Sequence, residues 1–390
     1  MNPLLSGALF TALSPLALAG GTEASSDWLG LDEELNAVAS NVSLQGGGVE
    51  LGALFRGAYV MADGTDFNGF ADGNGDGNPD DQLGMVVDDA ELWSQGTVGD
   101  YFWRISVDFG TQFSPYFIGG LIGTGAGTSA FANTARTDTL EDAYIDWRFS
   151  DQFSLRLGHF ILPTTFSAAS NPDSLLMLGR TTSGEYFHNY DLGAMLSGDY
   201  EQFQWHLAAT NGFDGTGDEQ RLFGRAIYNL GGGQNATEGA LGADENLNAA
   251  IGATFWDDGT VDDSDVVAFD VSATVGQISF SGEFVTYGDA HATAAAGTFA
   301  GATNLGYTAG SGPSVWGLTV SYLLNEEWEI AARMEDMDDL ANTEIMSFGL
   351  NYYQLGHNAK WQLMLMSVSS DVAVNEGSVI ALGVTVGSNG

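Results

Sequence analysis

Apolar and polar residues alternate in many separate segments of this chain, and that alternation constrains the fold more than any other feature. In residues 101–109 one face is apolar and the other carries Arg104, Ser106 and Asp108. The same pattern recurs in residues 140–149, 153–160, 328–335 and 379–386. A period of two residues is typical of β-strands whose two faces meet different surroundings.

About sixteen segments of roughly ten residues show this pattern, which is the even strand number and the strand length that bacterial outer-membrane barrels require. They lie near residues 48–60, 84–97, 100–109, 139–150, 151–161, 187–199, 201–211, 221–230, 246–256, 265–276, 277–287, 313–324, 326–337, 343–354, 358–369 and 378–387. We therefore predict an all-β fold, a transmembrane antiparallel β-barrel. A soluble protein of two packed sheets also alternates in this way and stays open as an alternative.

The connections between these segments alternate in length. If the N-terminus is periplasmic, connections after odd-numbered strands are long and external, and those after even-numbered strands are short turns. The long connections are residues 61–83, 110–138, 162–186, 212–220, 257–264, 288–312, 338–342 and 370–377. The exception is the Gly-rich stretch 231–245, where a short turn is expected. The alternation favours the barrel over the soluble alternative.

The first residues have the features of a secretory signal peptide. An apolar stretch ends in Ala17-Leu18-Ala19, a small-x-small cleavage site. We expect residues 1–19 to be a signal peptide, residues 20–47 a periplasmic N-terminal segment with a short helix, and residues 48–387 the barrel. No later apolar run approaches the ~18 residues of a membrane helix, so strands must span any membrane.

The chain is strongly acidic, with 51 Asp and Glu residues against 10 Lys and Arg residues and a formal net charge of −41. This charge excludes nucleic acid as a partner, because neutralising phosphates needs clustered Lys and Arg. Disorder is excluded as well, since 44% of the residues are hydrophobic. Cysteine is absent, which rules out disulfides and cysteine metal sites.

Three groups of motifs carry a resemblance to a known family. They are LEDAYIDWRF (140–149) with residues 153–160 and the segment through Arg180, DLGAMLSG (191–198), and WEIAARMED (328–336) with residues 349–353 and 356–363. In order and spacing they resemble the phosphate-selective porin O and P family. The resemblance implies a sixteen-stranded barrel, usually trimeric, with a long external loop folded inward. It also implies anion passage along an arginine ladder with a lysine-rich vestibule, whereas this chain has a single lysine, Lys360.

Charged residues on the polar faces of the predicted strands are candidates for the pore lining. They are Arg56, Arg104, Asp108, Asp142, Asp146, Arg148, Arg156, Arg225, Glu329, Arg333 and Glu335. A wall of arginines facing a wall of carboxylates creates a transverse field that orders water and sieves solutes. The alternative is charge pairing that stiffens the barrel wall.

Residues 162–186 are the best candidate for a loop that narrows the pore, because they follow the fifth strand and carry an apolar cluster of their own. A long loop of this kind is more often functional than idle. Asn171, Asp173 and Arg180 are the candidate constriction residues. A plain surface loop or a trimer contact is the alternative.

Residues 72–81 contain the sharpest local motif, with side-chain oxygens at alternate positions. The candidate ligands are Asp72, Asn74, Asp76, Asn78 and Asp80. This matches the start of a calcium loop, but the twelfth position is Leu83 and not a bidentate Glu. The motif predicts weak Ca²⁺ binding in an external loop, and a solvated acidic turn is the alternative.

Together these features predict a bacterial outer-membrane porin in the lipid bilayer, a homotrimer through which small hydrophilic solutes and ions diffuse passively. No catalytic residue and no required cofactor is expected. The acidic loops and the single lysine favour cation preference or weak selectivity, whereas the resemblance implies an anion- or phosphate-selective porin. A secreted calcium-binding β-protein and a barrel enzyme remain open, although the chain contains neither G-x-S-x-G nor H-E-x-x-H.

Overall fold

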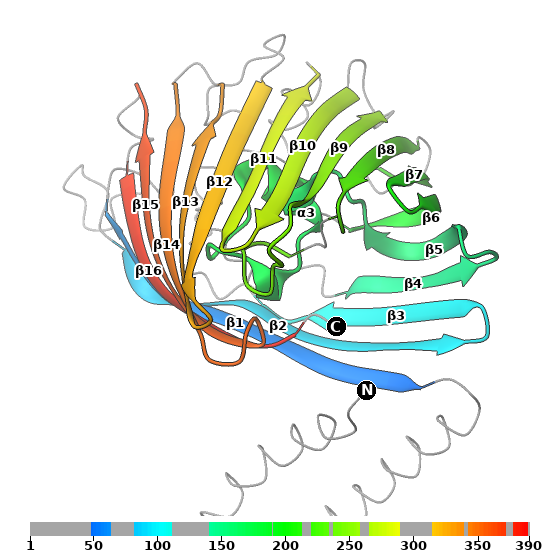
Figure 1. Cartoon of the computed structure of the whole chain (residues 1–390), viewed down its shortest axis with the longest axis horizontal. Coiled ribbons are helices and arrows are strands. Elements are labelled where there is room, and N and C mark those ends of the chain that lie inside the picture. The colour runs from blue at the N-terminus through cyan, green and yellow to red at the C-terminus, as the bar shows by residue number, and fades with distance from the viewer. Residues whose placement is uncertain are drawn as a thin grey trace, which may run out of the picture. The chain divides into compact units, whose positions relative to one another are not determined.

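Sixteen strands close into one antiparallel barrel in the part of the chain that the structure describes (Figure 1). The structure is a computed structural model, and it describes residues 48–63, 82–110, 140–188, 190–212, 220–233, 237–257, 265–288, 314–338, 342–371 and 377–388. Each strand pairs with its neighbours in the chain, and β1 pairs with β16 to close the ring. The predicted fold class is confirmed. The predicted signal peptide, N-terminal segment and calcium loop lie outside the described residues.

The strands follow the predicted segments closely. They are β1 (Val49–Asp63), β2 (Gln82–Val98), β3 (Tyr101–Asp108), β4 (Leu140–Arg148), β5 (Phe153–Ile161), β6 (Tyr190–Tyr200), β7 (Phe203–Thr210), β8 (Arg221–Leu230), β9 (Asn248–Asp257), β10 (Asp265–Val275), β11 (Ile278–Tyr287), β12 (Ser314–Asn325), β13 (Trp328–Asp336), β14 (Glu344–Tyr353), β15 (Ala359–Ser369) and β16 (Gly377–Gly387). No helix that the structure describes is long and apolar enough to cross a membrane.

The outer face of the barrel is apolar and the inner face is mostly polar. In β10, for example, Phe269 is exposed outward, whereas Ala268 and Asp270 on either side of it are buried. An apolar exterior suits the hydrocarbon core of a bilayer, and ring closure pairs the backbone groups of both edge strands.

Aromatic side chains gather on the outer face at the end of the barrel where the short turns lie. Tyr101 and Trp147 stack with ring centroids 6.2 Å apart, and Phe153 contacts both Phe149 (6.0 Å) and Tyr200 (5.7 Å). These rings lie at or beside the turns 99–100, 149–152 and 201–202. They form the aromatic girdle that a membrane interface favours.

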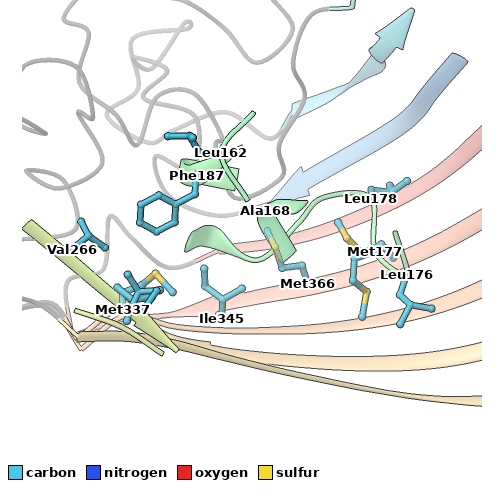
Figure 2. Packing of buried hydrophobic residues seen from close by; sticks show 14 of the residues in the cluster. Leu162, Ala168, Leu176, Met177, Leu178, Phe187, Val266, Met337, Ile345 and Met366 are labelled. Carbon is cyan, nitrogen blue, oxygen red and sulfur yellow. The ribbon is translucent and has the colours of Figure 1, made fainter. Parts of the chain in front are cut away.

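The connection between β5 and β6 folds into the barrel. This inner loop (residues 162–188) contains α3 (Phe166–Ala169), the short 3₁₀ helix η1 (Pro172–Ser174) and α4 (Thr182–Phe187). Figure 1 shows α3 surrounded by the ring of strands. Figure 2 shows Leu176, Met177 and Leu178 of this loop beside strands of the wall, and they belong to the same buried cluster as Ile345 and Met366.

The outward position of Val320 supplies a test of the barrel's placement in a bilayer. Val320 lies near the middle of β12, and Leu324 lies near its turn end; both face outward and are about half exposed. We expect Val320→Arg to lower the stability of the barrel in lipid vesicles by about 2–4 kcal/mol, because it places a charge at mid-bilayer depth. The matched Leu324→Arg should cost only about 0–1 kcal/mol, since its charge reaches the interface. Equal losses in urea titrations of the two variants would contradict the assigned depth.

Candidate functional site

The inner loop is organised by its own polar side chains. The Thr165 hydroxyl accepts a hydrogen bond from the Ala168 backbone N–H (3.2 Å) at the start of α3. The Thr181 hydroxyl accepts one from the Gly184 backbone N–H (2.9 Å) at the start of α4. Pro172 occupies the first turn of η1, where its missing N–H costs nothing. These hydrogen bonds within the loop cap its helices and help to define its shape independently of the wall.

Wall side chains donate hydrogen bonds to the backbone carbonyls of the loop. Arg225 of β8 donates to Thr164 O (2.7 Å), and Arg56 of β1 donates to Leu178 O (2.7 Å). Further donors of this kind include Thr254 to Thr164 O (2.7 Å), Arg333 to Gly179 O (2.8 Å), Lys360 to Leu175 O (2.6 Å), Gln362 to Leu175 O (2.8 Å) and Asn351 to Leu176 O (3.1 Å). The stretch around η1 lacks a strand partner, so these donors satisfy carbonyls that are otherwise costly to bury.

Two carboxylates hold the other end of the loop. Glu283 of β11 accepts a hydrogen bond from the Thr181 hydroxyl, and Glu335 of β13 accepts one from the Thr182 backbone N–H (2.5 Å). Both glutamates are buried. Carboxylates of the wall therefore accept hydrogen bonds from the start of α4. Other wall side chains donate hydrogen bonds to the carbonyls of residues 175–179.

The wall also leaves steric room for the loop. A Cβ atom at Gly349 would lie 2.9 Å from the Met177 sulfur, and one at Gly383 would collide with the Leu178 side chain. Both glycines face inward, on β14 and β16. Wall and loop are thus complementary in shape as well as in hydrogen bonding.

The arginines and carboxylates of the lumen lie beside one another. The ion pairs are Arg56 with Asp88 (3.0 Å) and Asp89 (2.7 Å), Arg104 with Glu91 (3.1 Å) and Asp142 (2.7 Å), Arg156 with Asp146 (2.8 Å), Arg221 with Asp191 (3.4 Å), Arg225 with Asp270 (2.6 Å), and Arg333 with Glu238 (3.3 Å). The prediction of an arginine wall that faces a separate carboxylate wall is therefore wrong. Arg56, Arg104 and Arg156 pair with carboxylates of adjacent strands, whereas Arg221 and Arg225 pair across one intervening strand and Arg333 pairs with the connection between β8 and β9. The pairing is expected because an unpaired buried charge is far more costly than a paired one.

The predicted pore-lining residues all lie on inward-facing strand positions, but they divide into two groups. Nine of the eleven are buried, and the exceptions are the partly buried Arg156 and the exposed Arg148. Arg56, Arg225, Arg333 and Glu335 contact the inner loop and lie behind it, and Glu329 is also fully buried. The other buried members are Arg104, Asp108, Asp142 and Asp146, and Asp108 accepts hydrogen bonds from the backbone N–H groups of Ala90 (2.7 Å) and Gly110 (2.8 Å).

The candidate constriction residues lie at the middle of the inner loop. Arg180 is buried and donates to Ser170 O (2.8 Å), and Asp173 is buried as well. Asn171 is exposed, between α3 and η1. Arg180 thus helps to hold the loop's own fold, whereas Asn171 presents its side chain to solvent. Their role in constriction stays a prediction.

A recess of about 550 Å³ lies between β4–β7 and the inner loop. Charged and polar strand residues line it, and Pro163 and Ala169 contribute from the loop. The strand residues include Asp146, Arg148, Arg156, Ser197, Gln204 and His206. Arg156 also lies over the Tyr144 ring, 3.9 Å from its centroid. The lumen is therefore open beside β4–β7, whereas the inner loop fills it beside β8–β16.

Several functional side chains were not selected from the sequence. Asn351, Lys360 and Gln362 donate hydrogen bonds to the loop. Their positions on the inward face of alternating strands could have marked them as lumen residues. Glu238 pairs with Arg333, and it lies in the Gly-rich stretch that broke the long–short alternation. The predicted Ca²⁺ ligands lie outside the described residues, and no cluster of three metal-binding side chains occurs within the described ranges.

A closed sixteen-stranded barrel with an apolar exterior, an aromatic girdle and an inward-folded loop defines an outer-membrane channel. The family model for phosphate-selective porin O and P matches residues 64–241, a range that includes the motifs at 140–149 and 191–198, and confirms the resemblance that they carry. The chain is a porin of the bacterial outer membrane.

Similar solved structures include two outer-membrane proteins. The in-vitro folded trimer form of OmpT from Vibrio cholerae is 10% identical, with a TM-score of 0.50 over 87% of this chain and 99% of that chain. The outer membrane channel DcaP of Acinetobacter baumannii is 13% identical, with a TM-score of 0.50 over 87% of this chain and 97% of that chain. At these identities they show the fold alone. A comparison with curated proteins found no match.

The anchoring of the loop by Arg56 gives a direct test. Arg56→Met removes the donor to Leu178 O and the ion pairs of Arg56 with Asp88 and Asp89. We expect the free energy of unfolding in lipid vesicles to fall by about 3–5 kcal/mol, as it does when one partner of a buried ion pair is removed. Arg148→Met is the control, because Arg148 is exposed, and it should change stability by about 0.5 kcal/mol or less. Tryptophan fluorescence in urea measures both, and equal values would show that Arg56 does not anchor the loop.

Proposed function

We propose that this porin is a passive diffusion channel for small hydrophilic solutes and ions, that it prefers cations, and that it assembles as a homotrimer. The observation that carries the selectivity is the pairing of the lumen arginines. Six of them have a carboxylate oxygen within 3.4 Å, and eight different carboxylates take part in these pairs. A guanidinium that is already neutralised attracts a passing anion weakly.

The remaining positive groups among the described residues also support this proposal. Lys360 and Arg180 are buried and donate to backbone carbonyls of the inner loop, so they present no free charge to the pore water. Arg148 is exposed beside the recess, 5.6 Å from the centroid of the Phe102 ring. In the part of the chain that the structure describes, it is the natural candidate for a local anion contact, and one such group does not make a ladder.

The acidic character of the whole chain acts in the same direction. With 51 acidic and 10 basic residues, the solvated surface of the channel carries a large negative excess. A negative mouth concentrates cations and repels phosphate within a Debye length, about 8–10 Å at ordinary salt. We infer that cation preference is strongest at low salt and weakens as salt rises.

The geometry supports a conduction path on the β3–β7 side of the lumen. The inner loop packs against β8–β16 and β1, whereas the recess on the opposite side is lined by polar side chains of β4–β7. A solute on this path passes the paired charges Asp146 and Arg156. We expect the channel to pass many kinds of small hydrophilic solutes, because alternating charged and amide side chains can form hydrogen bonds with all of them.

The trimeric state rests on the family resemblance and on the trimer form of OmpT, a protein with the same fold. We extend the trimeric state to this chain as a proposal. Cross-linking of protein folded in detergent tests it.

A catalytic alternative rests on one specific contact. Ser197 Oγ and His206 Nδ1 are 2.8 Å apart in the recess, on paired positions of β6 and β7. A nucleophilic serine needs a histidine that a third group orients. Among the described residues no carboxylate forms an ion pair with His206, so the channel function is favoured over hydrolysis.

Reversal potentials across a KCl gradient test the proposed selectivity. We expect wild-type protein in planar bilayers to show discrete conductance steps and a cation preference at low salt. Asp146→Asn frees the Arg156 charge and should move the reversal potential towards the chloride value. Glu326→Gln makes the same charge change in an exposed turn and should leave it nearly unchanged. A clear chloride or phosphate preference of the wild type at low salt would overturn the proposal.

We also propose that residues 72–81 bind Ca²⁺ weakly, on the basis of their sequence motif. The affinity should resemble that of extracellular calcium modules, on the order of 10⁻⁴–10⁻³ M. Calorimetry should show binding heat for the wild type and a reduced heat for Asp76→Ala. The same heat in both proteins would remove calcium from the proposal and leave the channel function intact.

A further inference from the structure

The connection between β8 and β9 breaks the pattern of short turns, and the structure shows where its extra residues go. This β8–β9 turn, which the structure describes at residues 231–233 and 237–247, lies at the end of the barrel with the short turns, which we take as the periplasmic end, yet part of it is buried. Glu238 is 3% exposed and Ala240 is 1% exposed. A turn that merely joined two strands would lie in solvent, so the burial of a carboxylate here requires a reason.

Glu238 connects three parts of the lumen. Its carboxylate accepts a hydrogen bond from the Leu176 backbone N–H (3.0 Å), at the centre of the inner loop. It also pairs with Arg333 of β13 (3.3 Å), which itself donates to Gly179 O. The Glu238 backbone N–H lies 3.4 Å from the Ser174 hydroxyl, which accepts from it. The β8–β9 turn therefore contacts the inner loop through one side chain and one backbone group.

The next two residues bring the β8–β9 turn to the barrel wall. The Ala240 backbone N–H donates to Glu329 Oε1 (2.7 Å), and the Tyr353 hydroxyl donates to Glu329 Oε2 (2.7 Å). Gly239 has a φ of +93°, and a Cβ there would lie 3.1 Å from the Leu176 side chain and 3.0 Å from Glu329. Loop, turn and wall meet at this glycine with no spare room.

The outer part of the β8–β9 turn is stabilised locally. The Asn248 side chain (3.0 Å) and the Asn246 backbone N–H (2.6 Å) donate to the exposed Asp244 carboxylate, and these hydrogen bonds lower its pKa below the ordinary value. The Gly276 backbone N–H donates to Asp244 O (2.8 Å), which ties the turn to the neighbouring β10–β11 turn. The turn thus has a fixed base from which Glu238 reaches inward.

We propose that the β8–β9 turn is the periplasmic half of the pore constriction and that Glu238 is a positioning residue that latches the inner loop. The inner loop enters from the external side and the β8–β9 turn from the periplasmic side, and they meet at Leu176. Loop position is then coupled to the periplasmic surface, so anything that draws the turn outward loosens the constriction. This inference rests on the proposed channel function and adds to it a contact that holds the inner loop in place.

Single-channel recordings of full-length protein in planar bilayers test the latch. Glu238→Ala removes the hydrogen bond to Leu176 and the pair with Arg333. We expect a new, larger conductance level, because the population of unlatched loops should rise roughly 10- to 100-fold when a charge-assisted buried hydrogen bond is lost. Glu238→Gln keeps the hydrogen-bond acceptor and should lie between Ala and wild type. Glu245→Gln is the control, since Glu245 is exposed in the same turn.

A second pair of variants keeps the test independent of charge. Gly239 and Gly242 both have a positive φ in this turn, but a Cβ at Gly242 meets nothing within 4 Å. Gly239→Ala should therefore produce the larger conductance level, and Gly242→Ala, which carries similar backbone strain, should not.

The outcomes separate the latch from the channel itself. Wild-type protein without conductance steps would sink the channel function. Normal wild-type steps, with Glu238→Ala and Gly239→Ala indistinguishable from their controls, would overturn the latch alone. A lowered melting temperature of the folded barrel in these two variants, without a new conductance level, would also overturn it, because Glu238 would then have only a structural role.

Discussion

Every backbone polar group that is removed from water needs a partner, and the rest of this structure depends on that requirement. The strands meet it by pairing in a closed ring, in which β1 and β16 leave no free edge. The inner loop cannot meet it in the same way, because its central residues 175–179 are in neither a strand nor a helix. Side chains of the wall supply the missing donors, and this fixes where the lumen's positive charges lie.

That arrangement gives the lumen arginines a structural role. Arg56, Arg225 and Arg333 each bind a loop carbonyl and a carboxylate at once. Each guanidinium thus has a carboxylate beside it and holds a loop carbonyl, so we expect these arginines to stabilise the shape of the pore more than they attract anions. The number of arginines in a lumen therefore measures anion affinity poorly unless their partners are known. Here each of the three has a carboxylate beside it, from β2, from β10 or from the connection between β8 and β9.

The sequence predicted which residues of the site face inward, but it predicted few of the contacts that these residues make. The alternation placed Arg56, Arg333 and Glu335 on inward faces, and the length and apolar cluster of residues 162–186 marked the loop that folds inward. Partners such as Arg56 with Leu178 O join residues 122 positions apart, and strand periodicity carries no information about them. Glu238 was hidden for the same reason, although the length of its turn already departed from the expected pattern.

The sequence by itself determined the strands, their inward and outward faces and the closed barrel, because a two-residue period is a local property and lipid leaves few ways to satisfy a backbone. It also determined the strong acidity of the chain, on which the proposed cation preference rests. Only the tertiary structure decided which arginines lie behind the inner loop, which side of the lumen stays open, and that a periplasmic turn reaches the loop at Leu176. These features depend on how distant segments fill one shared interior, where each hydrogen bond excludes others, and no local pattern records that competition.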